Sequence, residues 1–288
     1  MALFGKLFGF EIRPEIGRLV GGCEIREKLA AGPMSTVYLA VNSDGQKVVA
    51  KILTPHGNRI AEKLTRKLGK PWEGERAKAL ANPNIVHTFN CGKERGNYYI
   101  IMEFLPGGNL AEKLRSREKW PLEQTLDMAL GAANGLAYVH EKGIIHRDIC
   151  SKNLMFDSKG AIKLIDFGVA INQYDQLRPT AVRTGRPSYQ APELIRYNRF
   201  NVQTDIYAFG VVLYEMFTGQ LPFVTDSRED TIAMHLRAEP VPPAAVNPSV
   251  PGTASALIMK ALAKIPQDRF MTMKELATAL IRLKSSVH

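Results

Sequence analysis

The 288-residue chain lacks the features of a disulfide framework, a zinc site or a membrane span. Its three cysteines, Cys23, Cys91 and Cys150, are odd in number and show no C-x-x-C spacing. A scattered, odd set of this kind excludes a stapled secreted domain and favours a reducing compartment, so we expect a cytoplasmic protein. The longest apolar runs, such as Phe209 to Tyr214, are far too short to cross a bilayer.

Long runs of one charge sign are also missing. The chain carries 38 Lys and Arg against 28 Asp and Glu, a net charge of +10, yet no five consecutive residues are basic. Dispersed positive charge is typical of solvated faces, so we predict no nucleic-acid partner. Met1 to Phe10 is apolar with one lysine. It is compatible with an interfacial helix that touches a membrane weakly, and with a segment packed on the domain or a frayed terminus.

The remaining composition, 45% apolar and 23% charged, is that of an ordinary globular chain. Residues 24–31, 35–41 and 46–53 read as three strands, with Asn42-Ser43-Asp44-Gly45 as a hairpin turn, and residues 98–104 read as another strand. Apolar residues recur at helical spacing over 122–141, and 203–219 is an apolar helix.

One stretch carries the chemistry. His146-Arg147-Asp148 is followed by Asn153, and Asp166-Phe167-Gly168 comes after the next short hairpin. Phosphoryl transfer from ATP requires a carboxylate to align the attacking hydroxyl, and an amide with a second carboxylate to hold Mg²⁺ against the phosphates. The two motifs resemble the H-R-D-x-x-x-x-N and D-F-G signatures of the protein kinase family.

The resemblance implies an α+β, bilobal fold, with a small antiparallel-sheet N-lobe carrying one helix and a larger, mainly helical C-lobe. We expect an N-terminal extension at 1–19, the N-lobe at 20–104 and the C-lobe at 105–288, with the catalytic domain spanning about 20–285. It also implies ATP and Mg²⁺ as cofactors and a protein as the substrate. Asp148 would accept the hydroxyl proton, and Asn153 and Asp166 would bind the metal.

The phosphate loop departs from the family pattern. Where kinases carry G-x-G-x-x-G-x-V, residues 30–37 keep the middle glycine, Gly32, while Ala30 and Ser35 hold the other two glycine positions. Small residues still allow backbone N–H groups to approach phosphates, although Ala and Ser disfavour positive φ. Lys51, at the end of Val49-Ala50-Lys51, resembles the lysine that holds the α- and β-phosphates.

A helix should carry the glutamate that pairs with Lys51. Residues 58–68 are helical in pattern, and Pro71 suits the first position of a second helix that runs to about Ala81. Counting back from Asn82-Pro83-Asn84-Ile85-Val86, which resembles the family's H-P-N-I-V turn, predicts Glu73. Glu75 and Glu62 are the alternatives, and all three could instead be solvated helix charges.

Residues 105–110 resemble the hinge between the kinase lobes. There the family recognises adenine through backbone groups, here those of Glu103 and Leu105, with Met102 behind the pocket. The resemblance adds further nucleotide-contacting positions at Leu29, Val37, Ala50 and Met155. Asn109 is predicted either to contact the ribose or to cap the following helix.

Asp166 to Glu193 resembles an activation segment. Arg147 corresponds to the arginine that clamps a phosphorylated residue, and Thr180, Thr184 and Tyr174 are the hydroxyls in reach. The alternative is a segment already ordered by its own arginines, Arg178, Arg183 and Arg186. The resemblance also implies that Asp205 bonds the catalytic-loop backbone and that Arg269 forms an ion pair with Glu193.

Two linked positions break the pattern. Serine/threonine kinases usually carry a lysine two residues after the catalytic aspartate and a threonine before A-P-E; here these positions hold Cys150 and Arg186. Our hypothesis is that Lys152, aided by Arg186, supplies the lost cation. Residues 204–215 and 260–269 resemble bacterial-type serine/threonine kinases, which favours serine or threonine as the acceptor.

Three alternatives stay open beside an active serine/threonine kinase. They are a tyrosine or dual-specificity kinase, a pseudokinase that binds nucleotide as a scaffold, and a small-molecule phosphotransferase. Ala191-Pro192-Glu193, Asp205 and Arg269 disfavour the last, because they resemble parts of a lobe that binds protein substrates. The sequence predicts neither the substrate's identity nor the oligomeric state.

Overall fold

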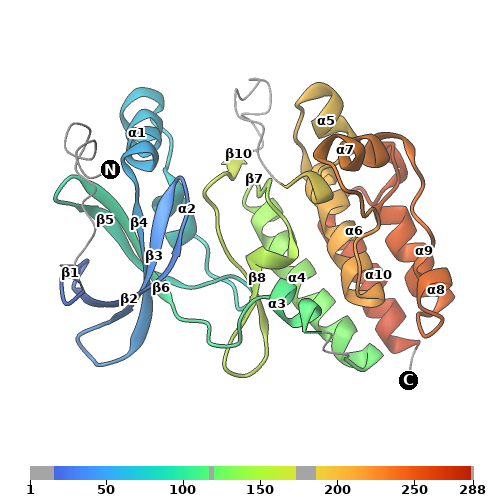
Figure 1. The fold of residues 1–288 in the computed structure, drawn as a ribbon, viewed down its shortest axis with the longest axis horizontal. Coiled ribbons are helices and arrows are strands. Elements are labelled where there is room, and N and C mark those ends of the chain that lie inside the picture. The colour runs from blue at the N-terminus through green and yellow to red at the C-terminus, as the bar shows by residue number, and fades with distance from the viewer. Residues whose placement is uncertain (1–15, 117–119, 173–185, 287–288) are drawn as a thin grey trace, which may run out of the picture. The chain divides into compact units, whose positions relative to one another are not determined.

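A computed structural model of the chain describes residues 16–116, 120–172 and 186–286, and these residues fall into two units (Figure 1). The first contains the described part of Met1–Lys78 together with Thr88–Phe104. The second contains Ala79–His87 and the described part of Leu105–His288. Residues 79–87, which the sequence placed in the N-lobe, therefore group with the second unit. Within the described ranges, no helix combines the length and the apolar character that a membrane span needs.

The first unit is built on an antiparallel sheet in the order β1-β2-β3-β4-β6-β5. Its strands are β1 (Leu19–Val20), β2 (Cys23–Ala31), β3 (Ser35–Val41), β4 (Lys47–Leu53), β5 (Thr88–Glu94) and β6 (Asn97–Glu103). Alternate side chains bury one face, where Ile25, Ala40, Ala50 and Ile101 are at most 2% exposed. Lys51 lies next to Ala50, so its side chain leaves the opposite face of β4.

Helix α1 (Pro55–Glu62) begins at Thr54, whose hydroxyl accepts a hydrogen bond from Gly57 N, and continues as a π-helical turn at Lys63–Lys67. Helix α2 (Glu73–Lys78) starts later than the position predicted at Pro71 and ends before Ala81. The reason is Trp72, which turns into the core at 3% exposure and packs against Tyr98, with the two rings tilted by 60°. Gly74 is required there, because a Cβ would lie 2.3 Å from the Trp72 ring.

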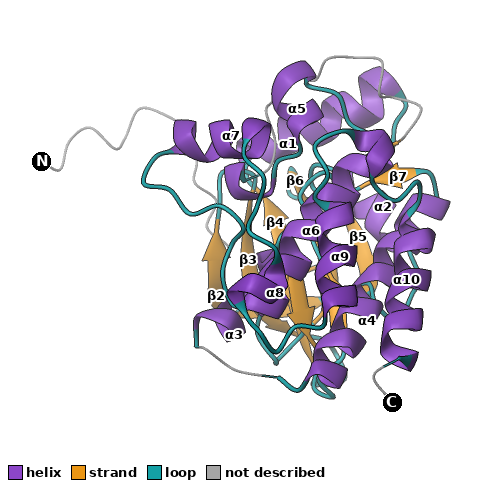
Figure 2. Cartoon of the chain, turned by 90° about the vertical axis from the view of Figure 1, so that its right-hand side faces the viewer, coloured by secondary structure: helices purple, strands orange, loops and turns teal. Residues whose placement is uncertain are grey.

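The second unit is mainly helical (Figure 2). Its α-helices are α3 (Leu110–Arg115), α4 (Leu122–Glu141), α5 (Pro192–Tyr197), α6 (Val202–Thr218), α7 (Arg228–Arg237), α8 (Pro243–Val246), α9 (Gly252–Ala261) and α10 (Met273–Ser285). Helix α6 is apolar almost all round and buried, whereas α10 is amphipathic and packs along α4. Asn201 caps α6, and Gly219 ends it at φ +77°.

Short strand pairs position the loops of this unit. Strand β7 (Ile144–Ile145) pairs with β10 (Ile171–Asn172), and β8 (Leu154–Phe156) pairs with β9 (Ile162–Leu164). The β8–β9 hairpin turns at residues 157–160, where the Asp157 carboxylate accepts from Lys159 N and Ala161 N. The loop that follows β7 and the loop that follows β9 are therefore brought side by side.

Residues 79–87 bind to β9 and to α4. Leu164 N donates to Asn84 O at 2.8 Å, Val86 N donates to Leu164 O at 3.0 Å, and the Asn84 amide donates to Ile162 O at 3.1 Å. Helix α4 carries Gly135 at this contact, since a Cβ there would lie 2.7 Å from Asn84 O. These backbone contacts explain why the segment belongs to the second unit.

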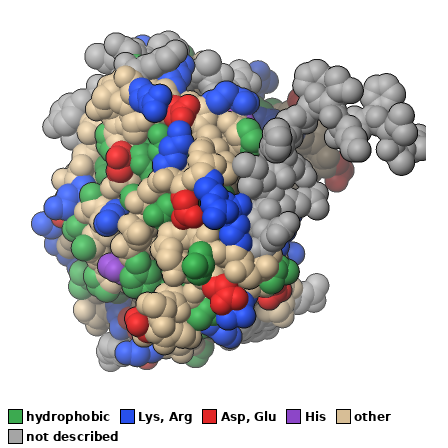
Figure 3. All heavy atoms as spheres, turned by 90° about the vertical axis from the view of Figure 1, so that its left-hand side faces the viewer, with side chains coloured by type: hydrophobic (Ala, Val, Ile, Leu, Met, Phe, Trp, Pro, Cys, Tyr) green, Lys and Arg blue, Asp and Glu red, His purple; other side chains and the backbone are tan. Residues whose placement is uncertain are grey.

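Figure 3 shows a face on which Lys and Arg side chains are interspersed with Asp and Glu side chains. The net charge of +10 is therefore not collected into one continuous basic patch on that face. Several of the ion pairs are exposed, such as Lys93 with Glu62, and exposed pairs of this kind contribute little to stability.

Candidate active site

The catalytic-loop motif lies directly after β7, and its backbone is held by a buried carboxylate on α6. Asp205 accepts hydrogen bonds from His146 N at 2.7 Å and from Arg147 N at 2.9 Å. Its Oδ2 also lies 2.9 Å from His140 Nε2. Burial works to raise the pKa of the Asp205 carboxyl, but these partners outweigh burial and hold it below its ordinary value.

The hydrogen bonds from the loop backbone to Asp205 hold an unusual conformation, because Arg147 has a left-handed backbone at φ +71°. That conformation costs a non-glycine residue about 1–3 kcal/mol and persists only where the surroundings enforce it. The Arg147 guanidinium stacks on the Phe200 ring with a centroid distance of 3.8 Å. The conformation turns the chain so that Asp148 follows at the start of the loop.

Asp148 and Asn153 are joined side chain to side chain. The Asn153 amide nitrogen donates to Asp148 O at 2.7 Å and to Asp148 Oδ2 at 2.9 Å. Burial raises the pKa of the Asp148 carboxyl, although Arg186 and the Asn153 amide act in the opposite direction. Because the amide nitrogen is used inside the loop, the amide oxygen of Asn153 is the atom suited to a metal ion.

Asp166 reaches the same region from β9. Ile165 N donates to Asn153 O at 2.9 Å, and Phe167 is buried with its ring edge against His146. Asp166 itself is exposed, has φ +67° and accepts from Gly168 N at 3.1 Å. The structure thus brings Asp148, Asn153 and Asp166 onto adjoining loops of the second unit.

In the first unit, Lys51 Nζ lies 2.5 Å from Glu73 Oε1, and both side chains are about 10% exposed. The other two glutamates weighed from the sequence have different partners. Glu75 accepts from Trp72 N, just before its own helix, and Glu62 pairs with Lys93. The Glu73 carboxylate thus fixes the position of the buried Lys51 ammonium group, a compact positive charge on β4.

The turn between β2 and β3 contains Gly32, whose N–H donates to Ser35 O at 2.9 Å. Neither Ala30 nor Ser35 adopts a positive φ, since both lie in strands. The loop geometry therefore tolerates the two missing glycines. Strand β2 carries two register irregularities against β3, between Ile25 and Glu27 and between Lys28 and Ala30.

The residues predicted for the adenine pocket come from both units. Leu29, Val37, Ala50, Met102 and Glu103 lie on β2, β3, β4 and β6, and Leu105 and Met155 lie in the second unit. Their meeting around a nucleotide stays a prediction. Asn109 caps α3, because its side chain accepts from Glu112 N at 2.9 Å while Glu112 accepts from Asn109 N.

Of the activation segment, Thr180 and Thr184 lie outside the described residues, as do Tyr174, Arg178 and Arg183. The segment is described again from Arg186. Glu193, at the start of α5, forms a two-point ion pair with Arg269, and both residues are buried. This contact joins the end of the segment to the residues before α10.

The sequence did not point to a set of hydrogen-bonded side chains that contacts the catalytic loop, namely Tyr189, Ser151 and Glu215. Tyr189 donates to Glu215 Oε2 at 2.7 Å, and its hydroxyl lies 2.9 Å from Ser151 Oγ. Burial and the Glu215 charge raise the pKa of Tyr189 well above its ordinary value, so it stays protonated. Neither Tyr189 nor Glu215 belongs to a motif, and only their positions beside Ala191-Pro192-Glu193 and on α6 could have pointed to them.

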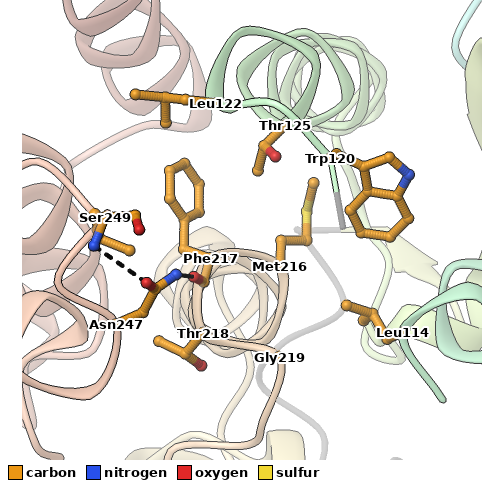
Figure 4. A pocket seen from close by; sticks show the side chains of 11 residues that line it. Leu114, Trp120, Leu122, Thr125, Met216, Phe217, Thr218, Gly219, Asn247 and Ser249 are labelled. Carbon is orange, nitrogen blue, oxygen red and sulfur yellow. Dashed lines mark hydrogen bonds between the residues drawn. The ribbon is translucent and has the colours of Figure 1, made fainter. Parts of the chain in front are cut away.

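A cavity of about 450 Å³ lies elsewhere in the second unit, between α4 and the end of α6 (Figure 4). Asn247 borders it and donates to Phe217 O at 2.9 Å, and Ser249 N donates to Asn247 Oδ1. Its lining residues include Trp120, Leu122, Thr125, Met216 and Phe217. No residue of the catalytic loop lines this cavity, so it is separate from the candidate active site.

Comparisons with known proteins agree with this geometry. Residues 23–280 match the protein kinase domain family. A probable serine/threonine-protein kinase of Clostridium perfringens is 31% identical over 271 residues, covering 93% of this chain and 39% of that protein. The serine/threonine-protein kinase PknB of Mycobacterium leprae is 32% identical over 269 residues, covering 91% of this chain and 43% of that protein. A probable serine/threonine-protein kinase of Streptomyces coelicolor is 33% identical over 267 residues, covering 90% of this chain and 39% of that protein.

The chain therefore belongs to the protein kinase family. The predicted α+β kinase fold is confirmed, with an antiparallel sheet in one unit and mainly helices in the other. The resemblance to bacterial-type serine/threonine kinases is confirmed as well. The chain spans about two fifths of the length of these curated relatives.

Proposed function

We propose that the chain is the catalytic domain of an ATP- and Mg²⁺-dependent protein kinase that phosphorylates serine or threonine hydroxyls of protein substrates. The observation that carries the proposal is the Asp148–Asn153 pair, held on a loop whose backbone is bonded to Asp205. The three cysteines are unpaired, which supports a cytoplasmic location.

Asp148 is the group we assign to the substrate hydroxyl. Its Oδ2 is bonded to the Asn153 amide, so Oδ1 is the oxygen that would accept the hydroxyl proton as the phosphoryl group transfers. The burial of Asp148 places this carboxylate in a region of reduced solvation, where hydrogen bonds hold its orientation strongly.

Asn153 and Asp166 fit a magnesium site, because they offer an amide oxygen and a carboxylate from adjoining loops, and Mg²⁺ prefers a few protein oxygens together with phosphate oxygens. Bound there, the ion would neutralise charge on the phosphates. Lys51, positioned by Glu73, is the residue we assign to the α- and β-phosphates. Lys152 is exposed and is assigned to the transferring phosphoryl group.

We also propose that phosphorylation of Thr180 or Thr184 regulates the domain through Arg147. Arg147 is 7% exposed and is already fixed against Phe200, so its guanidinium is held in place for an anionic partner. Both threonines lie outside the described ranges, and their place in the chain between Asp166 and Glu193 supports this assignment.

The test is incubation with γ-³²P-labelled ATP and Mg²⁺, alone and with a generic protein substrate, beside the Asp148→Asn variant. Acid hydrolysis then identifies the labelled amino acid. We expect labelled phosphoserine or phosphothreonine that is lost in the variant. Labelled phosphotyrosine would contradict the acceptor assignment, and nucleotide binding without any label would favour a pseudokinase scaffold.

A further inference from the structure

The positive charge nearest to Asp148 comes from outside the catalytic loop. Arg186 Nη1 lies 3.7 Å from Asp148 Oδ2 and is in contact with Cys150 Sγ. Lys152, in contrast, is exposed, and no ion pair or hydrogen bond joins its side chain to Asp148 within the part of the chain that the structure describes. The cation at this carboxylate therefore comes from a residue 38 positions further along the chain.

Arg186 is held by the residues that follow it. Tyr189 N donates to Arg186 O at 2.9 Å and so closes the 3₁₀ turn Pro187–Tyr189. The Tyr189 hydroxyl is in turn bonded to Ser151 on the catalytic loop and to Glu215 on α6. One docked turn thus sets the position of the guanidinium relative to Asp148.

Cys150 provides the room for this arrangement. Its side chain is short, 1% exposed and in contact with the Arg186 guanidinium. A long cationic side chain at position 150 would occupy the space of the guanidinium and repel it. Cys150 and Arg186 are therefore complementary: each residue type is suited to the other.

We propose that Arg186 is a positioning residue that orients the Asp148 carboxylate for the substrate hydroxyl, and that the active site carries this charge only while residues 186–190 are docked on the catalytic loop. The proposal rests on the kinase activity proposed above. The end of the activation segment then supplies positive charge beside Asp148 in addition to supporting the substrate.

The first test compares Arg186→Gln and Arg186→Lys with the wild-type chain. Arg186→Gln should lower kcat about tenfold or more while the Kd for ATP, measured by fluorescence titration, changes less than about twofold. Arg186→Lys should recover part of the loss, because it keeps the charge. Arg282→Gln on α10, an exposed arginine far from the loop in sequence, is the matched control and should behave as wild type.

The second test moves the cation back into the loop. Cys150→Lys alone and Arg186→Thr alone should each lower kcat, the first by crowding two cations and the second by removing one. The double variant Cys150→Lys/Arg186→Thr should be more active than either single variant. A purely structural role for Arg186 predicts additive losses, and additive losses would overturn the proposal.

Tyr189→Phe tests the dependence on docking. It should lower kcat in the wild-type background and have a smaller effect in the double variant, where the charge no longer comes from the segment. Failure of the two proposals can be told apart. If the wild-type chain transfers no phosphate, the proposed function fails; if the wild type is active and Arg186→Gln is equally active, only the role of Arg186 fails.

Discussion

Arg269 and Glu193 form a buried two-point ion pair in which Nη1 donates to Oε1 and Nη2 donates to Oε2, each at 2.8 Å. The remaining N–H groups of Arg269 donate to the carbonyl oxygens of Gln203, Ala263 and Lys264. All five donors of the guanidinium are thus used, which lysine could not reproduce. The pair connects the end of the activation segment to the closing helices of the second unit.

Removing this arginine should destabilise the protein strongly. Arg269→Met leaves the Glu193 carboxylate buried without its cation, so we expect the free energy of unfolding in urea to fall by about 3–5 kcal/mol. Asp127→Asn is the matched control, because Asp127 is 55% exposed in its pair with Lys284, and it should cost less than about 1 kcal/mol. Equal losses of unfolding free energy in the two variants would show that the buried pair stabilises the protein no more than the exposed pair does.

Glu73 should matter for ATP use where Glu75 does not. Glu73→Gln removes the charge that holds Lys51 and should lower kcat/KM for ATP about tenfold or more. Glu75→Gln changes a glutamate on the same helix that accepts from Trp72 N, and it should alter kcat/KM less than about threefold. A steady-state assay over a range of ATP concentrations measures both, and a larger effect at Glu75 would reverse the assignment.

Lys152 should act on the transferring phosphate. Lys152→Ala is expected to lower kcat more than about tenfold, since a cation there would stabilise charge that develops during transfer. Lys159→Ala, in the exposed turn between β8 and β9, removes a lysine of the same type and should leave kcat unchanged. A near-neutral Lys152→Ala would leave Arg186 as the cation that matters.

His235 predicts how stability depends on pH. Burial, with a smaller contribution from Lys264, lowers the pKa of His235 from 6.5 to about 4, and its ring is bonded to Tyr207. As the pH falls, the unfolded chain protonates His235 at a higher pH than the folded chain does. The contribution of neutral His235 to stability is therefore fully present above pH 6.5 and is lost as pH falls towards 4. The loss is on the order of 3 kcal/mol.

Urea unfolding at pH 7.5 and at pH 4.5 measures this effect. His235→Gln should show a smaller fall in unfolding free energy between the two pH values than the wild type does. His56→Gln, at an exposed histidine, is the control and should follow the wild type. Parallel pH profiles for all three proteins would exclude His235 as the titrating group.

Sequence patterns predicted the long helices and most strands closely, because apolar residues recur at helical spacing in α4 and α6 is apolar almost throughout. Helix α2 was misplaced, since the contact of Trp72 with Tyr98 depends on tertiary packing that no local rule contains. The motif residues could be named because their spacing along the chain is fixed by the catalytic loop and by the short β8–β9 hairpin that follows it. The Tyr189–Ser151–Glu215 contacts could not, because they join three separated segments.

The position of Arg186 shows the same limit. Its identity drew attention in the sequence beside Cys150, but only coordinates could show that its guanidinium, and not Lys152, contacts Asp148. Long side chains reach several partners from one backbone position, so residue spacing alone leaves their targets open.

The attachment of residues 79–87 to β9 has a consequence for how the chain is made. A ribosome releases Ile85 and Val86 long before it synthesises Leu164, the residue that binds them in the folded protein. The sheet of the first unit cannot be cut out as one continuous piece, because this loop interrupts it between α2 and β5. A fragment ending at Phe104 would present Ile85 and Val86, which are 1% and 3% exposed in the whole chain, to water. Apolar surface exposed in this way makes an incomplete chain prone to aggregation.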